Sequence, residues 1–390
     1  MDKTLDYLER SEPLPINMSL HRDNVRFSHR PFFKIIPHVI ERLKSLSVEL
    51  GNLQEITPHL SRSAPLLEEL LVRGYEGAPR HSPMLTSTPF NGDLSSLRSL
   101  HLECVITELP WRNMVNLTSL VLVNMSQPSV KQLLNFFEGA PHLCEVELHS
   151  TSPSHDAQDG QLVSLGSLKS MRINGSGQHS LLLDHLLIPV GACLEVEVAL
   201  PSPSIGNCPP KFFNNLRNLL NFTTIQLLNS GMLRSRVEFG GPNGQVIMYP
   251  NVFQPNTPCL ALGSLDLFDT SNAKRLEVRY GDSPTRDSPH QSLLPMEDLH
   301  TLVLHQYNQP YTFIDALDPS MSLSGILVCP KLEELIIEGG EMLDPAKVVG
   351  MAAARALRGV KLRLIRITRL DKFGEVDVFE LRKHVSHVEC

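Results

Sequence analysis

The end of the chain carries residue types that readily bind a metal. His384, His387 and Cys390 follow one another at three-residue intervals, and imidazole and thiolate groups are ligands that zinc prefers. Structural zinc sites take four ligands, however, and the sequence offers no second pair such as C-x-x-C. The same spacing suits the exposed side of a terminal helix. We therefore predict no metal site and no cofactor.

Two other groups contain residue types that could act in catalysis. His21-Arg-Asp23 has the order of a kinase catalytic triplet, but Ser28 stands where a kinase carries asparagine, and no glycine-rich phosphate loop occurs. A second group falls in a serine-rich stretch that we expect to be a solvated loop: His149, His155, Asp156 and Asp159. Nucleotide-binding and serine-hydrolase motifs are also absent from the sequence. We expect a protein without catalytic residues, and so not an enzyme.

A repeated leucine pattern indicates what the chain builds instead. Leu97-Arg-Ser-Leu100-His-Leu102 has the form L-x-x-L-x-L, in which apolar residues may be Leu, Ile, Val or Met. Further copies begin at Leu43, Leu67, Leu117, Leu143, Leu168, Leu299 and Leu332. In the first part of the chain they recur near the roughly 20–29 residues of a leucine-rich repeat.

The spacing has a simple physical meaning. Side chains alternate between the two faces of a strand, so x-L-x-L places its apolar residues on one face. A single short strand cannot bury that face, whereas stacked copies cover one another. The sequence therefore predicts an α/β leucine-rich-repeat solenoid. It would be a horseshoe with parallel strands on the concave face and helices and loops on the convex face.

We expect one leucine-rich-repeat domain over residues 1–390. Its predicted parts are an N-terminal flank with the first strand (1–34), regular repeats (35–200), an irregular segment with a β-hairpin (201–260), further repeats (261–340) and a C-terminal cap (341–390). Within these parts, helices are predicted at 129–137, 344–357 and 376–388. The hairpin would pair 235–239 with 245–249 around a Gly/Asn turn.

The residues between the leucines of each strand should point away from the core. They would form a mixed apolar and acidic surface that binds a protein partner. The predicted surface consists of Glu69, Leu71, Ser99, His101, Ser119, Val121, Glu145, Glu147, Ser170, Arg172, Asp266, Glu277, Arg279, Val303, His305, Glu334, Ile336 and Glu338. The alternative is a catalytic β-solenoid or hydrolase with its site in the irregular 200–260 region.

Composition narrows the classes of partner and compartment. The formal net charge of −7 argues against a nucleic-acid surface, and no apolar run is long enough to span a membrane. The seven cysteines are scattered and odd in number, which indicates reduced thiols, and the first residues lack the apolar core of a signal peptide. We expect an intracellular protein, cytoplasmic or nuclear and not secreted.

Five phrases of the sequence resemble the repeat region of fungal F-box-like leucine-rich-repeat proteins. They are Leu5-Asp-Tyr-Leu-Glu-Arg-Ser11, Ser63-Ala-Pro-Leu-Leu-Glu-Glu-Leu70, Val328-Cys-Pro-Lys-Leu-Glu-Glu-Leu335, Val348-Val-Gly-Met-Ala-Ala-Ala-Arg355 and Leu381-Arg-Lys-His-Val-Ser-His-Val388. The likeness covers nearly the whole chain. It implies the substrate-recognition region of a receptor in a cullin–RING ubiquitin ligase.

The resemblance lacks one part of the family's design. Relatives carry an F-box, a small helical module that binds a Skp-type adaptor, upstream of the Leu-Glu-Arg-Ser phrase, and no F-box is detected in this sequence. The expected partner is thus a protein target of unknown identity. A Skp-type adaptor is expected only where an F-box is supplied elsewhere.

Overall fold

A computed structural model describes most of the repeat region. The described residues are 8, 10–11, 13–20, 30–49, 57–74, 85, 89–107, 111, 113–125, 128–151, 161–174, 182–199, 223–229, 235–241, 244–251, 265, 270–279, 289–305, 311–321, 326–339, 343–368 and 373–389. They form an α/β structure whose main sheet has 16 strands, is mostly parallel and is not closed. The chain divides into two compact units, with residues 1–195 in the first and most of 196–390 in the second.

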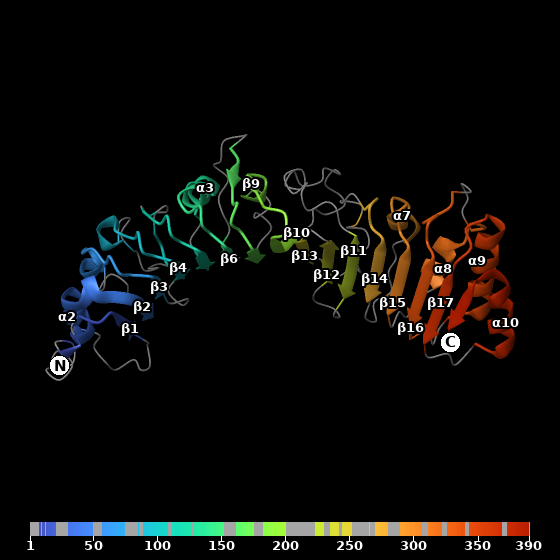
Figure 1. Ribbon diagram of the computed structural model, residues 1–390, viewed down its shortest axis with the longest axis horizontal. Coiled ribbons are helices and arrows are strands. Elements are labelled where there is room, and N and C mark those ends of the chain that lie inside the picture. The colour runs from blue at the N-terminus through green and yellow to red at the C-terminus, as the bar shows by residue number, and fades with distance from the viewer. Residues whose placement is uncertain are drawn as a thin grey trace. The chain divides into compact units, whose positions relative to one another are not determined.

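The first unit is a run of parallel strands in chain order (Figure 1). The strands are β1 (Ile16–Leu20), β2 (Leu43–Glu49), β3 (Glu69–Arg73), β4 (Ser99–Glu103), β5 (Ser119–Val123), β6 (Glu145–His149), β8 (Ser170–Asn174) and the start of β10 (Cys193–Ala199). Two short strands, β7 (Val163–Ser164) and β9 (Leu186–Leu187), pair separately. Its helices are α2 (Arg30–Val39), α3 (Val130–Glu138) and the single turns η1 (Ile40–Arg42), η3 (Thr57–Leu60) and η4 (Pro89–Gly92).

The leucine pattern produces these strands as the alternation predicts. On β4, Leu100 and Leu102 are fully buried, whereas the alternating residues Ser99, His101 and Glu103 are partly exposed. Strand register places each buried residue beside its equivalent, so Leu100 lies between Leu70 and Leu120. Each buried leucine contributes roughly 1.5–3 kcal/mol. The core of this unit is therefore a set of apolar rows that run across the strands.

The leading leucine of each repeat closes a tight turn before its strand. The amide of Leu97 donates to the carbonyl of Leu94, and Leu117 donates likewise to Met114. The next amide, that of Thr118, then donates to Arg98 of the preceding repeat. The turn thus both buries a leucine and delivers the chain into register with its neighbour.

Helix α3 begins and ends as its sequence predicts. Ser129 accepts a hydrogen bond from the amide of Gln132, and the Gln132 side chain accepts one from the amide of Ser129. This reciprocal cap satisfies donors that the first helical turn leaves open. Phe136 and Phe137 are buried, and Gly139 ends the helix.

The second unit contains parallel strands joined to an antiparallel segment. Its strand order is β13 (Gly244–Asn251), β12 (Ser235–Gly241), β11 (Thr224–Asn229), β14 (Arg275–Arg279), β15 (Thr301–His305), β16 (Glu334–Glu338), β17 (Leu364–Thr368) and β18 (His387–Glu389). The antiparallel pair β12–β13 turns at Gly241–Gly244, where the sequence predicts a hairpin. The other pairs from β11 through β14 to β18 are parallel.

Helices of the second unit follow one another along one side of its strands (Figure 1). They are α7 (Pro289–Leu293), α8 (Tyr311–Leu317), α9 (Pro345–Leu357) and α10 (Glu375–His384). The predicted helix over 344–357 is confirmed as α9, with Asp344 capping the amide of Ala346 and Pro345 in the first turn.

The predicted helix over 376–388 is wrong at its end. Helix α10 stops at His384, and Val385 takes an extended conformation. The amide of His387 then donates to the carbonyl of Arg363, so the last residues form β18 beside β17. Val385 is buried from outside the helix, which is why its apolar spacing resembled a helical face.

Arg355 ties the end of the repeat array together from inside. Its side chain is fully buried on α9, and its guanidinium donates to the carbonyls of Val328 (2.9 Å) and Cys329 (2.8 Å). Burial lowers the pKa of Arg355 and raises the pKa of the Cys329 thiol to about 12, so the thiol stays protonated. The arginine thus binds a buried turn before β16, in which the amide of Leu332 also donates to the carbonyl of Cys329.

Replacing Leu120 with alanine should lower the free energy of unfolding by about 2–5 kcal/mol, because it opens a cavity in a fully buried row. His101→Ala on the neighbouring strand changes a partly exposed side chain and should have a small effect. Urea unfolding followed by circular dichroism measures both. Equal midpoints for the two variants would contradict the assignment of the two faces.

Arg355→Ala should lower the free energy of unfolding by about 3 kcal/mol, because the buried carbonyls of Val328 and Cys329 lose the guanidinium and a large side chain is deleted. Arg382→Ala removes an exposed arginine from α10 and is the matched control. The same unfolding measurement separates them, and a silent Arg355→Ala variant would show that the turn needs no internal donor.

Candidate functional site

The face of each strand opposite the leucines is the candidate binding surface. For the first unit it comprises the outward residues of β2, β3, β4, β5, β6, β8 and β10, which we call the first outward face. The predicted residues of this face are all partly or fully exposed: Glu69, Leu71, Ser99, His101, Ser119, Val121, Glu145, Glu147, Ser170 and Arg172. Strand register arranges them in rows, with His101 beside Leu71 and Val121.

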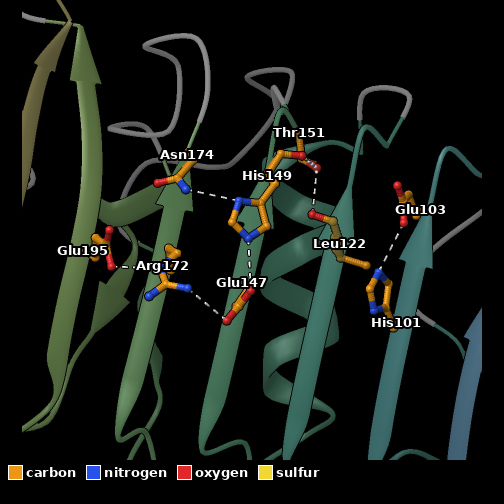
Figure 2. A network of polar contacts seen from close by, with 9 residues as sticks. All are labelled: His101, Glu103, Leu122, Glu147, His149, Thr151, Arg172, Asn174 and Glu195. Atoms are coloured by element: carbon orange, nitrogen blue, oxygen red, sulfur yellow. Dashed lines mark hydrogen bonds and ion pairs between the residues drawn. The ribbon is translucent and has the colours of Figure 1, made fainter. Parts of the chain in front are cut away.

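A polar network crosses the last strands of the first outward face (Figure 2). Arg172 lies between two carboxylates, with Nε 2.8 Å from Glu195 Oε2 and Nη1 3.4 Å from Glu147 Oε1. The other oxygen of Glu147 lies 3.0 Å from His149 Nε2. Asn174 Nδ2 lies 3.2 Å from the remaining ring nitrogen of His149. Three strands, β6, β8 and β10, are thereby joined on their outward side.

Thr151 anchors the upper edge of this network. It is fully buried, and its hydroxyl lies 3.1 Å from the carbonyl of His149 and 3.4 Å from that of Leu122 (Figure 2). The two carbonyls belong to neighbouring strands, so one hydroxyl links the ends of β5 and β6. Its position fixes the chain just after His149. The imidazole itself is held by Glu147 on one ring nitrogen and by Asn174 on the other.

His101 has a different environment on β4. Its Nε2 lies 3.7 Å from Glu103 Oε2, beyond hydrogen-bond distance (Figure 2). Arg73 Nε lies 2.7 Å from the same oxygen. Burial, and next the charge of Arg73, lower the pKa of His101 below its ordinary value. Its imidazole is therefore neutral at pH 7. Arg73 neutralises Glu103 in its place.

The second unit carries a denser cluster around Glu277, whose side chain is only 6% exposed. Arg279 donates from Nη2 (2.6 Å) and Nε (2.8 Å) to Glu277 Oε1, and His305 Nε2 lies 2.9 Å from that oxygen. The other ring nitrogen of His305 lies 2.6 Å from Glu338 Oε2. Burial opposes ionisation of Glu277, yet Arg279 and His305 hold its pKa below the ordinary value.

Three residues predicted to face solvent in the second unit are buried instead. These are Glu277, Val303 and Ile336, which occupy one row across β14, β15 and β16. In the adjacent row, Arg279 donates to Glu277, and His305 lies between Glu277 and Glu338. Alternation alone could not reveal this, because it gives the direction of a side chain and not what its neighbours cover.

The remaining predicted residues of the second unit fall as follows. Arg279 is exposed, while His305, Glu334 and Glu338 are partly exposed. Glu334 accepts a hydrogen bond from Thr301 Oγ1 (3.1 Å) and is paired with Arg363. Asp266 lies outside the described residues.

Several members of both networks were not predicted. Glu103, His149, Asn174 and Arg73 follow the last leucine of each strand by one residue, and the prediction stopped before that position. Glu195 lies on β10, where the leading leucine of the pattern is missing. Arg366, which pairs with Glu389, lies on β17 within a copy that begins at Leu362 and was not counted among the repeats. Extending the alternation by one step would have found the first group, because β3, β4, β5, β6 and β8 all reach that row.

The residues first weighed as metal ligands or catalysts do not come together in the described part. His384 ends α10 and His387 lies on β18. His149 was expected in a solvated loop but is the last residue of β6, because its backbone pairs with the neighbouring strands. Cys390, His21, Asp23, His155, Asp156 and Asp159 lie outside the described residues. Among the residues with described positions, no three His, Cys, Asp or Glu side chains form a metal-binding group. Among the same residues, none of the helices has the length and apolar character that crossing a membrane requires.

The sequence allows an alternative catalytic site in the irregular 200–260 region. Within that region the structure describes β11, β12, β13 and Thr223. Glu238 is the single carboxylate on these three strands, and it is paired with Arg236 at 2.6 Å. Gln245 Nε2 donates to Glu238 at 3.2 Å. On the described strands Glu238 is thus held by Arg236 and Gln245.

Comparison with known proteins gives no relative on which to base an assignment. No protein-family model matches the chain, and no curated protein matches it significantly.

Replacing Glu277 with glutamine should lower the free energy of unfolding at pH 7 by about 1.5–3 kcal/mol, because a buried carboxylate loses charge-assisted hydrogen bonds. A depressed pKa means that Glu277 stabilises the fold above its ordinary value of 4.5 and loses that effect as pH falls through its folded-state pKa. The difference between wild type and variant should therefore shrink below about pH 4.5.

Urea unfolding at a series of pH values measures this dependence. Glu380→Gln, on the exposed surface of α10, removes an equal charge and serves as the control. A difference for Glu277→Gln that stays constant from neutral pH into the acid range would show that the carboxylate is not stabilised by ionisation.

Proposed function

We propose that the chain is a leucine-rich-repeat solenoid that binds another protein on its outward faces. In this proposal the parallel strands line the concave side of a horseshoe, and helices and loops lie on the convex side. The supporting observation is the alternation of buried and exposed residues along the strands of the first unit. On β4, β5 and β6 every second residue is fully buried, and the residues on the opposite face are partly or fully exposed.

The chemistry of the first outward face favours recognition over catalysis. Its charged groups are mostly held by one another, as Arg172 is by Glu147 and Glu195, and ordered ion pairs give a surface a fixed pattern of charge. Leu71 and Val121 add apolar area that a partner could bury. Such a mixture of apolar and charged residues is typical of protein interfaces.

We further propose that the chain is the substrate-recognition region of an F-box-type receptor of a cullin–RING ubiquitin ligase, acting in the cytoplasm or nucleus. The support is the resemblance of the phrases around Ser63–Leu70, Val328–Leu335 and Val348–Arg355 to such receptors. Structurally, two of these phrases are the turns that lead into β3 and β16, and the third is α9. Adaptor binding would depend on an F-box supplied elsewhere.

Capture from a cell lysate, followed by mass spectrometry, tests the binding role. Ser119→Trp places a large ring in the middle of the first outward face without entering the core and should remove specific partners. Glu138→Trp puts the same ring on the exposed end of α3 and should retain them. A set of captured proteins unchanged by Ser119→Trp would contradict binding through this face.

The adaptor question needs a separate measurement. A pull-down of purified Skp-type adaptor by the 390-residue chain should yield no complex, while the same chain fused behind an F-box should bind it. Adaptor binding by the unfused chain would mean that these residues contain a recruitment site of another kind.

A further inference from the structure

The two units differ in how their outward charges are satisfied. On the second unit, Glu277 is paired with Arg279 and Glu334 with Arg363, and Glu338 Oε2 lies 2.6 Å from His305 Nδ1. Arg366 is likewise paired with Glu389. That surface presents closed ion pairs, and a charged ligand would have to displace them.

The first outward face keeps two carboxylates open. Glu69 on β3 and Glu145 on β6 are both exposed, and within the described part of the chain neither side chain has a hydrogen-bond or ion-pair partner. The register of β3 to β6 puts them in one row, with Ser99 and Ser119 between them. Because serine has a short side chain, Ser99 and Ser119 protrude less from the sheet than the two glutamates that flank them.

The dimensions of this row match an extended peptide. Three strand intervals of about 4.8 Å separate Glu69 from Glu145 by about 14 Å. A segment in extended conformation advances about 3.3 Å per residue and presents every second side chain to the same side. Two side chains four positions apart therefore span the same distance, and the one midway between them faces Ser99 and Ser119.

The charge of the face selects the type of side chain. Outward carboxylates on β2 to β10 outnumber outward arginines: Glu49, Glu69, Glu103, Glu145, Glu147 and Glu195 face Arg73 and Arg172. Lys44 on β2 is also exposed, and it pairs with Glu68 at 3.5 Å. Arg98 and Lys169 precede their strands and are exposed at the margin of the face, and neither forms an ion pair with Glu69 or Glu145 among the described residues. The potential over the row is negative, which favours lysine or arginine in a ligand.

From these observations we infer that the row Glu69–Ser99–Ser119–Glu145 binds an extended segment of a partner protein that carries basic residues at positions i and i+4. The basic side chains pair with Glu69 and Glu145. The residue at i+2 lies over the serines and next to His101 and Val121, so a small or aliphatic side chain fits there. A second copy of this chain would bring the same negative face and is disfavoured.

This inference rests on the proposed binding function and defines its partner more closely. The test is selection of a random peptide library, displayed on phage, against the full chain. Synthetic peptides from the selection are then titrated by fluorescence polarisation against wild type, the double variant Glu69→Gln/Glu145→Gln, the control Glu41→Gln/Glu138→Gln and Ser119→Trp. The control removes equal charge from exposed positions outside the face.

The inference expects selected peptides with two basic residues four positions apart. Their Kd should rise about fivefold or more in Glu69→Gln/Glu145→Gln, rise strongly in Ser119→Trp and stay unchanged in the control. Added salt should weaken them as well, because exposed ion pairs are screened.

Other outcomes separate the inference from the proposed function. Peptides that Ser119→Trp abolishes but Glu69→Gln/Glu145→Gln leaves untouched would overturn the basic segment and keep the face as a binding site. Peptides indifferent to Ser119→Trp, or a selection that enriches none, would overturn the inference and remove support from the first outward face altogether.

Discussion

Lateral contact between equivalent apolar side chains is the interaction on which this structure depends. Leu100 has Leu70 on one side and Leu120 on the other, and the same holds for the row through Leu102. No strand has a core of its own, so each is stable only with its neighbours in place. The tight turns before the strands serve this contact, because they set the register in which the rows align.

Side-chain length decides how the opposite face behaves. In the first unit the outward positions include Ser99 and Ser119, so carboxylates such as Glu69 remain separated and exposed. In the second unit arginine and histidine stand beside glutamate, and they fold over the sheet to meet it. One backbone pattern thereby yields an open surface in one unit and a closed ionic layer in the other.

Much of the fold could be predicted from the sequence because its rules are local. The parity of L-x-L sets the buried face, Ser129 and Gln132 begin α3, and Asp344-Pro345 begins α9. Strand β18 was missed because three residues carry no pattern of their own, and its pairing depends on Arg363 more than twenty positions earlier.

The candidate site was predicted in outline and missed in its connections. Alternation gives the direction of Glu147 and Arg172, but the role of Thr151 requires knowing that two carbonyls from neighbouring strands end at the same place. The burial of Glu277 likewise depends on side chains contributed by β15 as well as by β14 itself. Such relations are set by tertiary contact and leave no signal in a single segment.

The strict parity of the first unit has an evolutionary consequence. On a strand such as β4, each residue belongs either to the buried core or to the outward face. Mutations can therefore change what the surface recognises without changing the core. Glu277 breaks this independence, because one residue is both outward in direction and buried in the fold. Lineages of this protein should accordingly diversify faster in the outward residues of β3 to β6 than around β14.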